Sequence, residues 1–484
     1  MRILYIDMDS CRADHLGCYG YPRNTSPTID RIARESAVFE NCYASDAPCL
    51  PSRTALFSGM FGYRTGVVGH AGTVQRPRDP GYGHRIHPDR LSLPEALATR
   101  AGLHTCSISP FGERHIAWHF YAGWREIHNS GKRGNDIAVD TNRQVLPWIA
   151  QNARKDNWFL HLNYWDPHRP YRTPLEYGNP FAGDPAPDWP DQKTISAQRK
   201  SYGPRSAAEP LGWGVKPTAR EPAAIRNRRD WKKWIDGYDT GIRYMDDHIA
   251  EVMDALRVQG VYDDLLIIFS ADHGENQGEL NVYGDHHTAD VPTSRVPLIV
   301  RGPRNAKGAC AVKAGRHKGF LYQLDLCPTL LEYAQQASPA GWDGRSFLPA
   351  LRGRNWNGRD WLVIGQGAWS AQRSVRVDNW LYLRTYDTGL HDWPDQMLFD
   401  IKKDPHQTQN LVDRRPEVVQ RCQALMQQWI DAVALSEGDP VSDPFVALIN
   451  EGGPLYTQGQ REWYAEFLRG QGKADCAKRM LSRR

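Results

Sequence analysis

The segment at residues 47–59, APCLPSRTALFSG, places Cys49 four residues before Arg53, at the start of a helical run that ends at glycine. A residue at a helix start lies near free backbone N–H groups and the positive end of the helix dipole, which suits a nucleophile that must bind an anion. The alternative is a buried loop cysteine beside a helix turn. Spacing alone leaves both interpretations open.

Carboxylates and a histidine follow two predicted strands. Asp9 closes the run ILYIDMD, and Asp272 and His273 follow LLIIFSA. If these strands are neighbours, the three side chains meet at one sheet edge and offer oxygen and nitrogen ligands to a divalent cation. Asp7 is expected on the same side of its strand as Asp9. Turn formation or capping for Asp9, and an ordinary hydrogen bond for His273, are the structural alternatives.

Three further loops carry candidate anion binders and proton donors, at residues 112–115 (GERH), 166–170 (DPHRP) and 284–287 (GDHH). A histidine between prolines directly after a strand, as at His168, is held rigidly, which general acid–base chemistry requires. Each loop histidine taken singly is more often structural than catalytic. A catalytic role for these histidines therefore depends on whether the fold places them beside the other candidate residues.

The elements that must position these residues are read from periodicity. Nearly continuous apolar runs, which predict strands covered on both faces, occur at residues 2–9, 158–164, 265–270 and 296–301. Helical patterns lie between them, one opening at Ser26-Pro27 and another stopping at Gly260. Strands alternating with helices predict an α/β fold around a largely parallel sheet, with ligands at the carboxyl ends of the strands.

The chain also divides along its length. The Pro-, Gly- and charge-rich stretch 173–229 predicts a long surface excursion. After residue 365, alternating segments precede a helical pattern at 416–434, which together predict a small antiparallel sheet packed with a helix. We therefore expect a catalytic domain at 1–365 and a smaller C-terminal subdomain at 366–484.

Composition excludes several classes of protein. With 484 residues, 40% of them hydrophobic, the chain can bury a core, and a net charge of +4 is too small to argue for a nucleic-acid partner. No stretch approaches the roughly 18 apolar residues of a membrane span. The nine cysteines show neither CxxC nor zinc spacing, so most should be free thiols. Met1 leads straight into a strand-like run, which predicts a cytoplasmic protein, or a periplasmic one if a leader has been removed.

The segment CLPSR resembles the C-x-P-S-R signature of the type I, formylglycine-dependent sulfatases of the alkaline phosphatase superfamily. Further blocks follow in the order of that family: DSCRADHLGCYG, SPTIDRIARESAVFENCYA, FLHLNYWDPHRPY, IIFSADHGE, RVPLIVRGP, DLCPTLLEYA and MLFDIKKDPHQTQNLVD. One short motif could arise by chance, but an ordered set hardly could. The resemblance implies an alkaline-phosphatase-like α/β fold, with a large mixed sheet flanked by helices and a smaller C-terminal α+β subdomain.

The resemblance also implies roles for individual residues. The expected metal ligands are Asp9, Cys49, Asp272 and His273, and the residues expected to act on the substrate are Cys49, Arg53, His115, His168 and His286. A maturation enzyme would oxidise Cys49 to formylglycine, whose hydrated aldehyde offers one hydroxyl for attack and another for release of sulfate. The metal implied is calcium. Manganese is the alternative, because imidazole suits it better.

Three departures from the family pattern stand out. Asp9 is followed by Ser10 where many members have a second aspartate, so either Ser10 or Asp7 must complete the coordination, or the metal differs. The second ligand pair is Asp-His rather than the common Asp-Asn. Glu113 replaces a lysine, and the neighbouring Arg114 is a candidate for the missing positive charge.

The implied function is hydrolysis of a sulfate ester. The substrate expected is small and sulfated, and 17 Trp and 21 Tyr favour a carbohydrate because aromatic rings stack on sugar faces. Hydrolysis of phosphonate monoesters or phosphodiesters is the alternative within the superfamily. A catalytically silent anion- or sugar-binding protein is the alternative of another class.

Overall fold

The computed structural model describes residues 1–78, 90–304, 306, 308–436 and 440–482. Its centre is strand β1 (Arg2–Met8), which pairs in parallel with β6 (Trp158–Tyr164) on one side and β7 (Leu265–Ser270) on the other. Every residue of β6 and β7 is buried, as expected for strands covered on both faces. The apolar runs in the sequence predicted these strands correctly.

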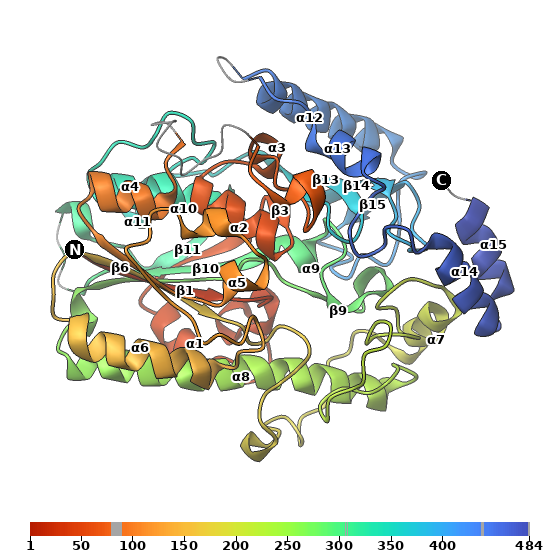
Figure 1. Cartoon of the computed structure of the whole chain (residues 1–484), viewed down its shortest axis with the longest axis horizontal. Coiled ribbons are helices and arrows are strands. Elements are labelled where there is room, and N and C mark those ends of the chain that lie inside the picture. Colours follow the sequence, from red (N-terminus) through yellow and green to blue (C-terminus); the bar gives the residue numbers. More distant parts are fainter. Residues whose placement is uncertain (79–89, 305, 307, 437–439, 483–484) are drawn as a thin grey trace.

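The main sheet has eight strands in the order β11-β2-β10-β7-β1-β6-β4-β5 (Figure 1). The outer strands are β11 (Gly315–Tyr322), β2 (Ala37–Tyr43), β10 (Arg295–Arg301), β4 (His104–Ile108) and β5 (Glu126–His128). Strand β10 runs antiparallel to both of its neighbours, and the other pairs are parallel. The predicted α/β class with a large mixed sheet is confirmed.

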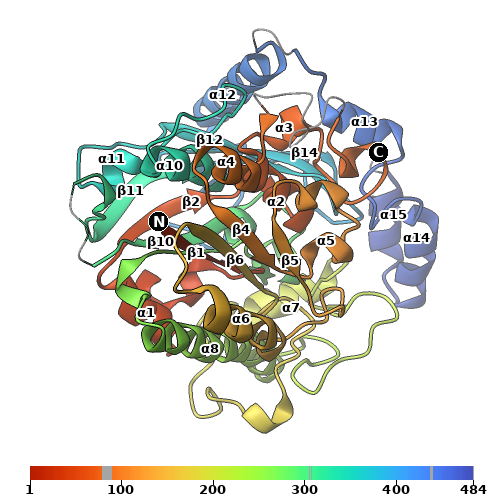
Figure 2. The same ribbon diagram turned by 60° about the vertical axis from the view of Figure 1, so that its left-hand side comes forward.

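Helices cover both faces of this sheet. Figures 1 and 2 show α1 (Pro27–Ala33), α6 (Ala138–Asn152) and α8 (Arg228–Val258) on one face, and α2 (Cys49–Ser58), α4 (Leu93–Arg100) and α10 (Leu326–Tyr333) on the other. Helix α8 buries an apolar stripe that includes Ile242, Ile249 and Leu256. Because this stripe recurs every three or four residues, it faces the sheet along the length of the helix.

A second sheet has the order β15-β14-β13-β12-β3. Its strands are β15 (Gln396–Asp400), β14 (Trp380–Asp387), β13 (Ala371–Val377), β12 (Trp361–Gln366) and β3 (Asp46–Ala47), and α12 (Pro416–Ala434) contacts it. The antiparallel strands and the helix match the elements predicted for the C-terminal region. Strand β3 comes from just before Cys49, so this sheet also holds the candidate nucleophile segment. The division proposed at residue 365 lies within β12 and stays a prediction.

The segment 173–229 contains the short helix η6 (Leu175–Tyr177) and α7 (Gln192–Lys200) between loops. Its Tyr202 packs against the C-terminal helices α14 (Arg461–Gly470) and α15 (Ala474–Ser482). Other elements are α3 (Gly62–Thr65), α5 (Phe111–Arg114), β8 (Asn276–Gln277), β9 (Tyr283–Asp285), α9 (Val291–Ser294), α11 (Leu348–Leu351) and α13 (Pro444–Asn450).

Two further predictions concern the whole chain. All nine cysteines are free, seven of them buried. Within the described residues, no helix has the length and hydrophobicity that crossing a membrane requires.

Candidate active site

Helix α2 directs three polar side chains toward the carboxyl ends of β1 and β7. Cys49 is its first residue, and Ser52 and Arg53 follow three and four positions later, so all three share one helix face. The hydroxyl of Ser52 donates to the backbone carbonyl of Asp272 at 2.5 Å. This bond fixes the start of the helix against the loop that follows β7.

Arg53 is fully buried and binds three carboxylates. Its Nε donates to Asp7 Oδ2 at 2.8 Å, and its Nη1 donates to Asp9 Oδ2 at 2.9 Å and to Asp272 Oδ2 at 2.6 Å. Three ionised carboxylates exceed the charge of one guanidinium, and buried charge without compensation is unfavourable. Burial raises the pKa of Asp272 to about 6, although Arg53 opposes this, so a proton or another cation is favoured there.

His273 presents a lone pair to the same cluster. Its Nδ1 donates to the carbonyl of Gly274 at 2.7 Å, and because a carbonyl only accepts, Nε2 carries no proton in the neutral ring. Nε2 lies 3.2 Å from Asp272 Oδ2 and 3.1 Å from Cys49 Sγ. A lone pair facing a carboxylate oxygen is favourable when a cation lies between them. A backbone carbonyl behind a ligating histidine is the usual arrangement in metal sites.

Burial raises the pKa of the Cys49 thiol well above its usual value, and Asp9 and Asp272 raise it further. The thiol therefore stays protonated at neutral pH. A protonated thiol is a poor nucleophile. Cys49 is well placed at the helix start, but its unmodified side chain is not activated.

The residues present fit a divalent cation. One candidate ligand atom from each of Asp9, Cys49, Asp272 and His273 lies within 4.8 Å of the others, and all four residues are buried. Carboxylate oxygens with one imidazole nitrogen form a donor set that calcium or manganese can accept. Asp7 Oδ1 is buried and has no hydrogen-bond partner among the described residues, so it is available as a further oxygen ligand.

Ser10 donates hydrogen bonds to two of the same carboxylates. Its hydroxyl donates to Asp9 Oδ1 at 2.9 Å and its backbone N–H donates to Asp272 Oδ1 at 3.1 Å. Ser10 thus orients the carboxylates, while Asp7 retains an unpaired oxygen. Of the two residues that could complete a coordination shell, Asp7 has the free acceptor.

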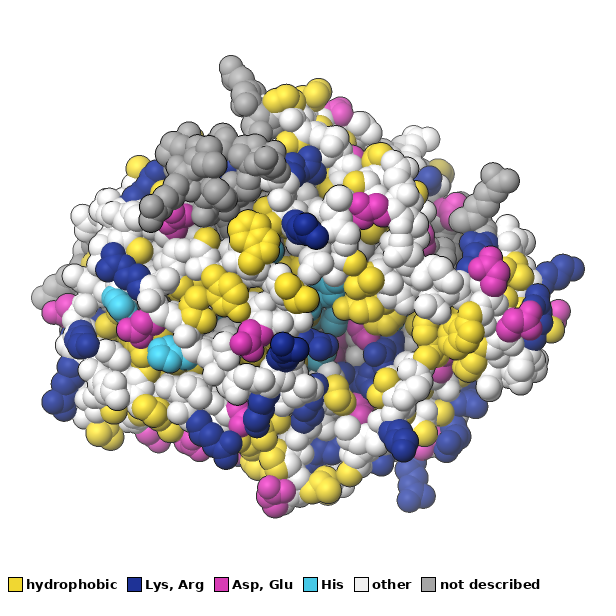
Figure 3. Space-filling model, viewed as in Figure 1, with side chains coloured by type: hydrophobic (Ala, Val, Ile, Leu, Met, Phe, Trp, Pro, Cys, Tyr) yellow, Lys and Arg dark blue, Asp and Glu magenta, His cyan; other side chains and the backbone are white. Residues whose placement is uncertain are grey.

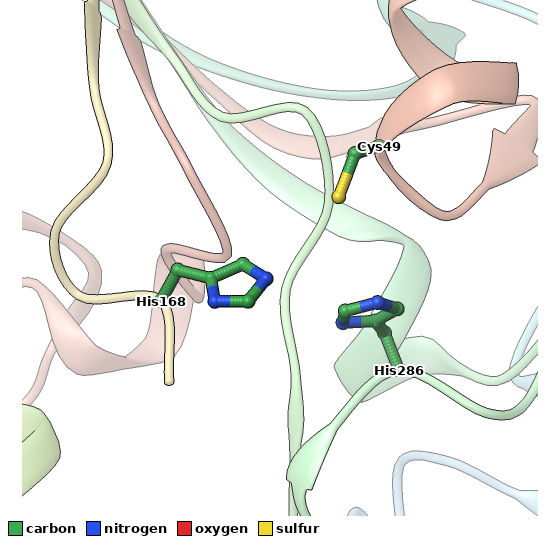
Figure 4. Close-up of side chains that lie close together, drawn as sticks. All are labelled: Cys49, His168 and His286. Atoms are coloured by element: carbon green, nitrogen blue, oxygen red, sulfur yellow. The ribbon is translucent and has the colours of Figure 1, made fainter. Parts of the chain in front are cut away.

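Two loop histidines also lie close to the cysteine. Figure 4 shows His168, after β6, and His286, after β9, pointing toward Cys49 Sγ, and one atom from each of the three side chains lies within 4.8 Å of the others. The Nδ1 atom of His286 is buried and has no partner among the described residues. Burial lowers the pKa of His168 to about 4 and that of His286 well below its usual value. Both rings are neutral at pH 7 before an anion binds.

His115 lies one layer away from this group. It follows α5, and its ring centroid is 4.8 Å from that of His70. Its Nε2 is buried without a partner among the described residues, and burial, His70 and Arg114 all lower its pKa. The structure therefore brings Cys49 and Arg53 together with the ligand candidates, and places His115 at the margin.

Sequence reasoning missed three residues of this region. His70 accepts from or donates to Tyr456 Oη through Nδ1 at 2.9 Å, although the two lie 386 residues apart. His161 lies inside β6, with Nε2 3.3 Å from Asp7 Oδ2 and Nδ1 3.0 Å from Ser107 Oγ. A histidine within a buried strand must find polar partners, so His161 was detectable from the sequence. Tyr456 carried no local signal.

The face drawn in Figure 3 has a hollow near its centre with histidine side chains inside it and Lys or Arg side chains beside it. Such a hollow, which presents imidazole and cationic groups, suits an anionic ligand. The chemistry available is attack on a tetrahedral anion, with candidate cation ligands and loop histidines both close to Cys49.

Known proteins share both the sequence pattern and the fold. Residues 2–336 match the profile of the family described as Sulfatase, and residues 278–434 match the one described as N-sulphoglucosamine sulphohydrolase, C-terminal. A choline-sulfatase of Rhizobium meliloti is 26% identical over 427 residues, which cover 80% of this chain and 78% of that protein.

Two solved structures have the same fold. One, a complex with its substrate D-glucosamine-2-N,6-O-disulfate, has a TM-score of 0.69 at 18% identity and covers 90% of this chain and 99% of its own. The other, a phosphonate monoester hydrolase from Silicibacter pomeroyi, has a TM-score of 0.64 at 19% identity and covers 90% and 96%. Because the Sulfatase profile covers more than two thirds of its length, this chain belongs to the sulfatase family of sulfuric ester hydrolases, with the alkaline-phosphatase-like fold of that family.

Proposed function

We propose that this sulfatase hydrolyses the sulfate ester of a small sulfated carbohydrate, with residue 49 acting as nucleophile in its formylglycine form. The observation that carries the proposal is that Cys49 belongs to two clusters of candidate ligands. One contains Asp9, Asp272 and His273, which suit a cation, and the other contains His168 and His286, which suit the sulfuryl oxygens.

A divalent metal held by Asp9, Asp272 and His273 would lower the pKa of the attacking hydroxyl and neutralise charge on the sulfuryl oxygens. The resemblance implies calcium, while the nitrogen of His273 favours manganese. Elemental analysis of purified protein identifies the metal. Removal with a chelator should lower kcat by at least about a hundredfold, and the native ion should restore it.

Each protein group has a distinct task. Hydrated formylglycine would supply two hydroxyls on one carbon, one to attack sulfur and one to release sulfate afterwards. His286 and His168 would each take up a proton when the sulfate anion binds, since both rings are neutral before that. Protonated His286 would then give a proton to the alcohol oxygen as its bond to sulfur breaks, because its Nδ1 is buried and has no partner among the described residues. Protonated His168 would hold a sulfuryl oxygen, and Arg53 keeps the three carboxylates in place.

Two observations support a sugar as the alcohol. A solved structure of the same fold holds a disulfated glucosamine as its substrate. In this chain, Trp369 and Tyr456 stack at 4.5 Å between ring centroids, and the Tyr456 hydroxyl lies 2.9 Å from His70 Nδ1, near the histidine group. Trp369 is also stacked on His287 at 3.9 Å, so Tyr456, which is 37% exposed, is the ring that can meet a sugar face.

Hydrolysis of phosphonate monoesters is the second candidate. It is favoured by the Asp272-His273 pair and by the structural likeness to a phosphonate monoester hydrolase. Aryl sulfate, phenyl phosphonate and sulfated monosaccharides assayed side by side separate the two. Sulfate release should exceed phosphonate turnover in kcat/KM, and the reverse order would contradict the proposal.

Maturation is tested on the peptide itself. Co-expression with a formylglycine-generating enzyme should convert Cys49 to the aldehyde, which mass spectrometry detects in the tryptic peptide 35–53. Persistent thiol together with no turnover would favour a silent binding protein. Fractionation of the cells that produce the chain tests the proposed cytoplasmic location against a periplasmic one.

A further inference from the structure

Two arginines at the edge of the candidate site lie against the same short turn. Arg114 is the last residue of α5, and Arg172 lies in the loop after β6. A Cβ built on Gly134 would be 3.1 Å from Arg114 Cδ, and Arg172 Nη2 donates to Asn135 Oδ1 at 3.3 Å. Neighbouring residues 134 and 135 thus contact one arginine each.

Neither guanidinium has an acidic partner. Among the described residues, Arg114 and Arg172 form no ion pair, and the bond to Asn135 is the single side-chain hydrogen bond of the two. Nearby arginines differ: Arg169 pairs with Glu221 at 2.6 Å. Burial lowers the pKa of Arg172, and Arg114 lowers it further despite the opposing charge of Asp166. Two close cations repel each other, and an anion between them removes that cost.

The pair lies within electrostatic reach of the site but outside its reacting centre. Arg172 is among the groups that lower the pKa of His168, and Arg114 is among those that lower the pKa of His70. Trp165 lies between: its ring centroid is 5.5 Å from that of His168, and its Cζ2 would be 2.7 Å from a Cβ on Gly134. Contacts therefore run from His168 through Trp165 to the turn that the arginines flank.

The reacting centre and the two arginines also differ in solvent exposure. Cys49, Asp9 and Asp272 are buried at the base of the site. Arg114 is exposed and Arg172 is half-buried, and Figure 3 shows basic side chains beside the histidines of the hollow. The arginines can thus meet the part of a substrate that extends out of the reacting centre.

We propose that Arg114 and Arg172 bind a second anionic group of the substrate, either a carboxylate or a further sulfate, next to the sulfate ester that reacts. This inference rests on the proposed function. The guanidinium fork donates two parallel hydrogen bonds to either group, and such charge-assisted bonds are about twice as strong as neutral ones. A substrate whose remaining part is cationic, as in choline sulfate, is disfavoured by the same two charges.

The experiment compares sugars that differ in one charge. Wild-type enzyme in its formylglycine form is assayed with N-acetylglucosamine 6-sulfate, with its disulfated analogues, with 2-sulfated glucuronic acid against 2-sulfated glucose, and with choline sulfate. At least one sugar with a second anion should exceed its singly charged partner in kcat/KM by about tenfold or more, which corresponds to about 1.4 kcal/mol. Choline sulfate should be the poorest substrate.

Variants assign the preference to the two residues. Arg172→Gln should lower kcat/KM for the preferred sugar about tenfold, mainly through KM, and leave the singly charged partner within about threefold. Arg114→Ala should also lower kcat/KM for the preferred sugar about tenfold, and should lower it less for the singly charged partner. Arg114→Lys keeps the charge but loses the fork, so it should give an intermediate loss. Arg154→Ala is the matched control, because it removes the same charge from the exposed segment before the amino end of β6.

The outcomes separate the inference from the proposed function. Equal use of singly and doubly charged sugars by the wild type, or equal loss on both in the variants, overturns the inference and leaves the sulfatase proposal intact. Turnover of phenyl phosphonate without sulfate release from any sugar contradicts the proposed function itself. Thermal unfolding of each variant identifies any loss that comes from misfolding.

Discussion

The inner arginine of this site, Arg53, and the two outer arginines, Arg114 and Arg172, have opposite surroundings. Arg53 is fully buried and donates to three carboxylates at 2.6–2.9 Å. Arg114 is exposed, Arg172 is half-buried, and neither forms an ion pair among the described residues. Only the buried Nη2 of Arg53 has no partner among the described residues, so Arg53 mainly positions the carboxylates, whereas an arginine without an ion pair gains its anionic partner when the substrate binds.

The inner centre, which contains Arg53, and the outer region, which contains Arg114 and Arg172, also lie on different kinds of element. The inner centre lies on β1, β7 and the start of α2, which belong to the buried core. The outer region lies on α5, on loops after β6 and on the segment that carries Tyr456. Rigid elements hold reacting groups in fixed geometry, and loops on such a scaffold vary more readily. The inner centre should therefore set the reaction, and the outer region should set the substrate.

Cys49→Ala should have the largest effect. If residue 49 is the nucleophile, kcat falls by about ten thousandfold or more, because binding and charge stabilisation alone remain. Initial-rate assays with aryl sulfate measure the loss. Cys49→Ser sharpens the test, because one hydroxyl can be sulfated but offers no second hydroxyl for release, so mass spectrometry should detect a stable sulfate ester at residue 49.

The result for Cys49→Ala tests whether the inner centre sets the reaction. Activity within tenfold of the wild type would show that the buried cysteine is structural. The unfolding free energy of the variant is the control. It should change little, since the side chain lost is small and the helix start is also held by Ser52.

Arg53→Gln should destabilise the protein as well as inactivate it. Removing the one cation among three buried carboxylates leaves charge uncompensated, which costs about 3–5 kcal/mol. Urea unfolding measures this loss, and a saturating divalent cation should reduce it if the carboxylates bind metal. The matched outer variant Arg114→Ala should alter stability by less than about 0.5 kcal/mol. Similar losses for the two would erase the distinction between the regions.

The inner centre could be predicted from the sequence, and the reason is local. Apolar runs identify β1 and β7, and if these strands are neighbours, as the structure shows, Asp9 and Asp272 after them lie at one sheet edge. The motif around Cys49 gives the helix start, and the spacing of Arg53 gives its face. Each inference needs only neighbouring residues and the period of the element.

The outer region could not be predicted in this way. Tyr456 reaches His70 across 386 residues, and β3 pairs with β12 although a two-residue strand has no periodicity. Such contacts depend on how loops pack, which local patterns do not encode. The sequence shows Arg114 as a charge beside a histidine. It does not show that Arg114 and Arg172 contact the same turn, at residues 134 and 135.

The buried His70 predicts that the protein becomes less stable in acid. Burial lowers the pKa of His70 to about 3, whereas the unfolded chain takes up this proton near pH 6.5. Between these values the unfolded state binds more protons, so stability falls as the pH falls. His70→Asn should reduce the slope of unfolding free energy against pH by up to about 1.4 kcal/mol per pH unit. Urea unfolding from about pH 6.5 to 4.5, with metal saturating, measures it, and an unchanged slope would contradict a neutral buried ring.

Tyr456→Phe should have the smallest effect. The variant removes the hydroxyl that contacts His70 Nδ1 and keeps the ring stacked on Trp369, so the hydrogen bond lost is worth about 0.5–1.5 kcal/mol. We expect kcat/KM to fall by no more than about tenfold, mainly through KM, because the contact orients an outer histidine. Tyr386→Phe is the matched control, since its half-exposed ring lies on β14. A loss in kcat beyond about a hundredfold would mean that Tyr456 and His70 act on the reacting group, and the outer region would then share in the chemistry.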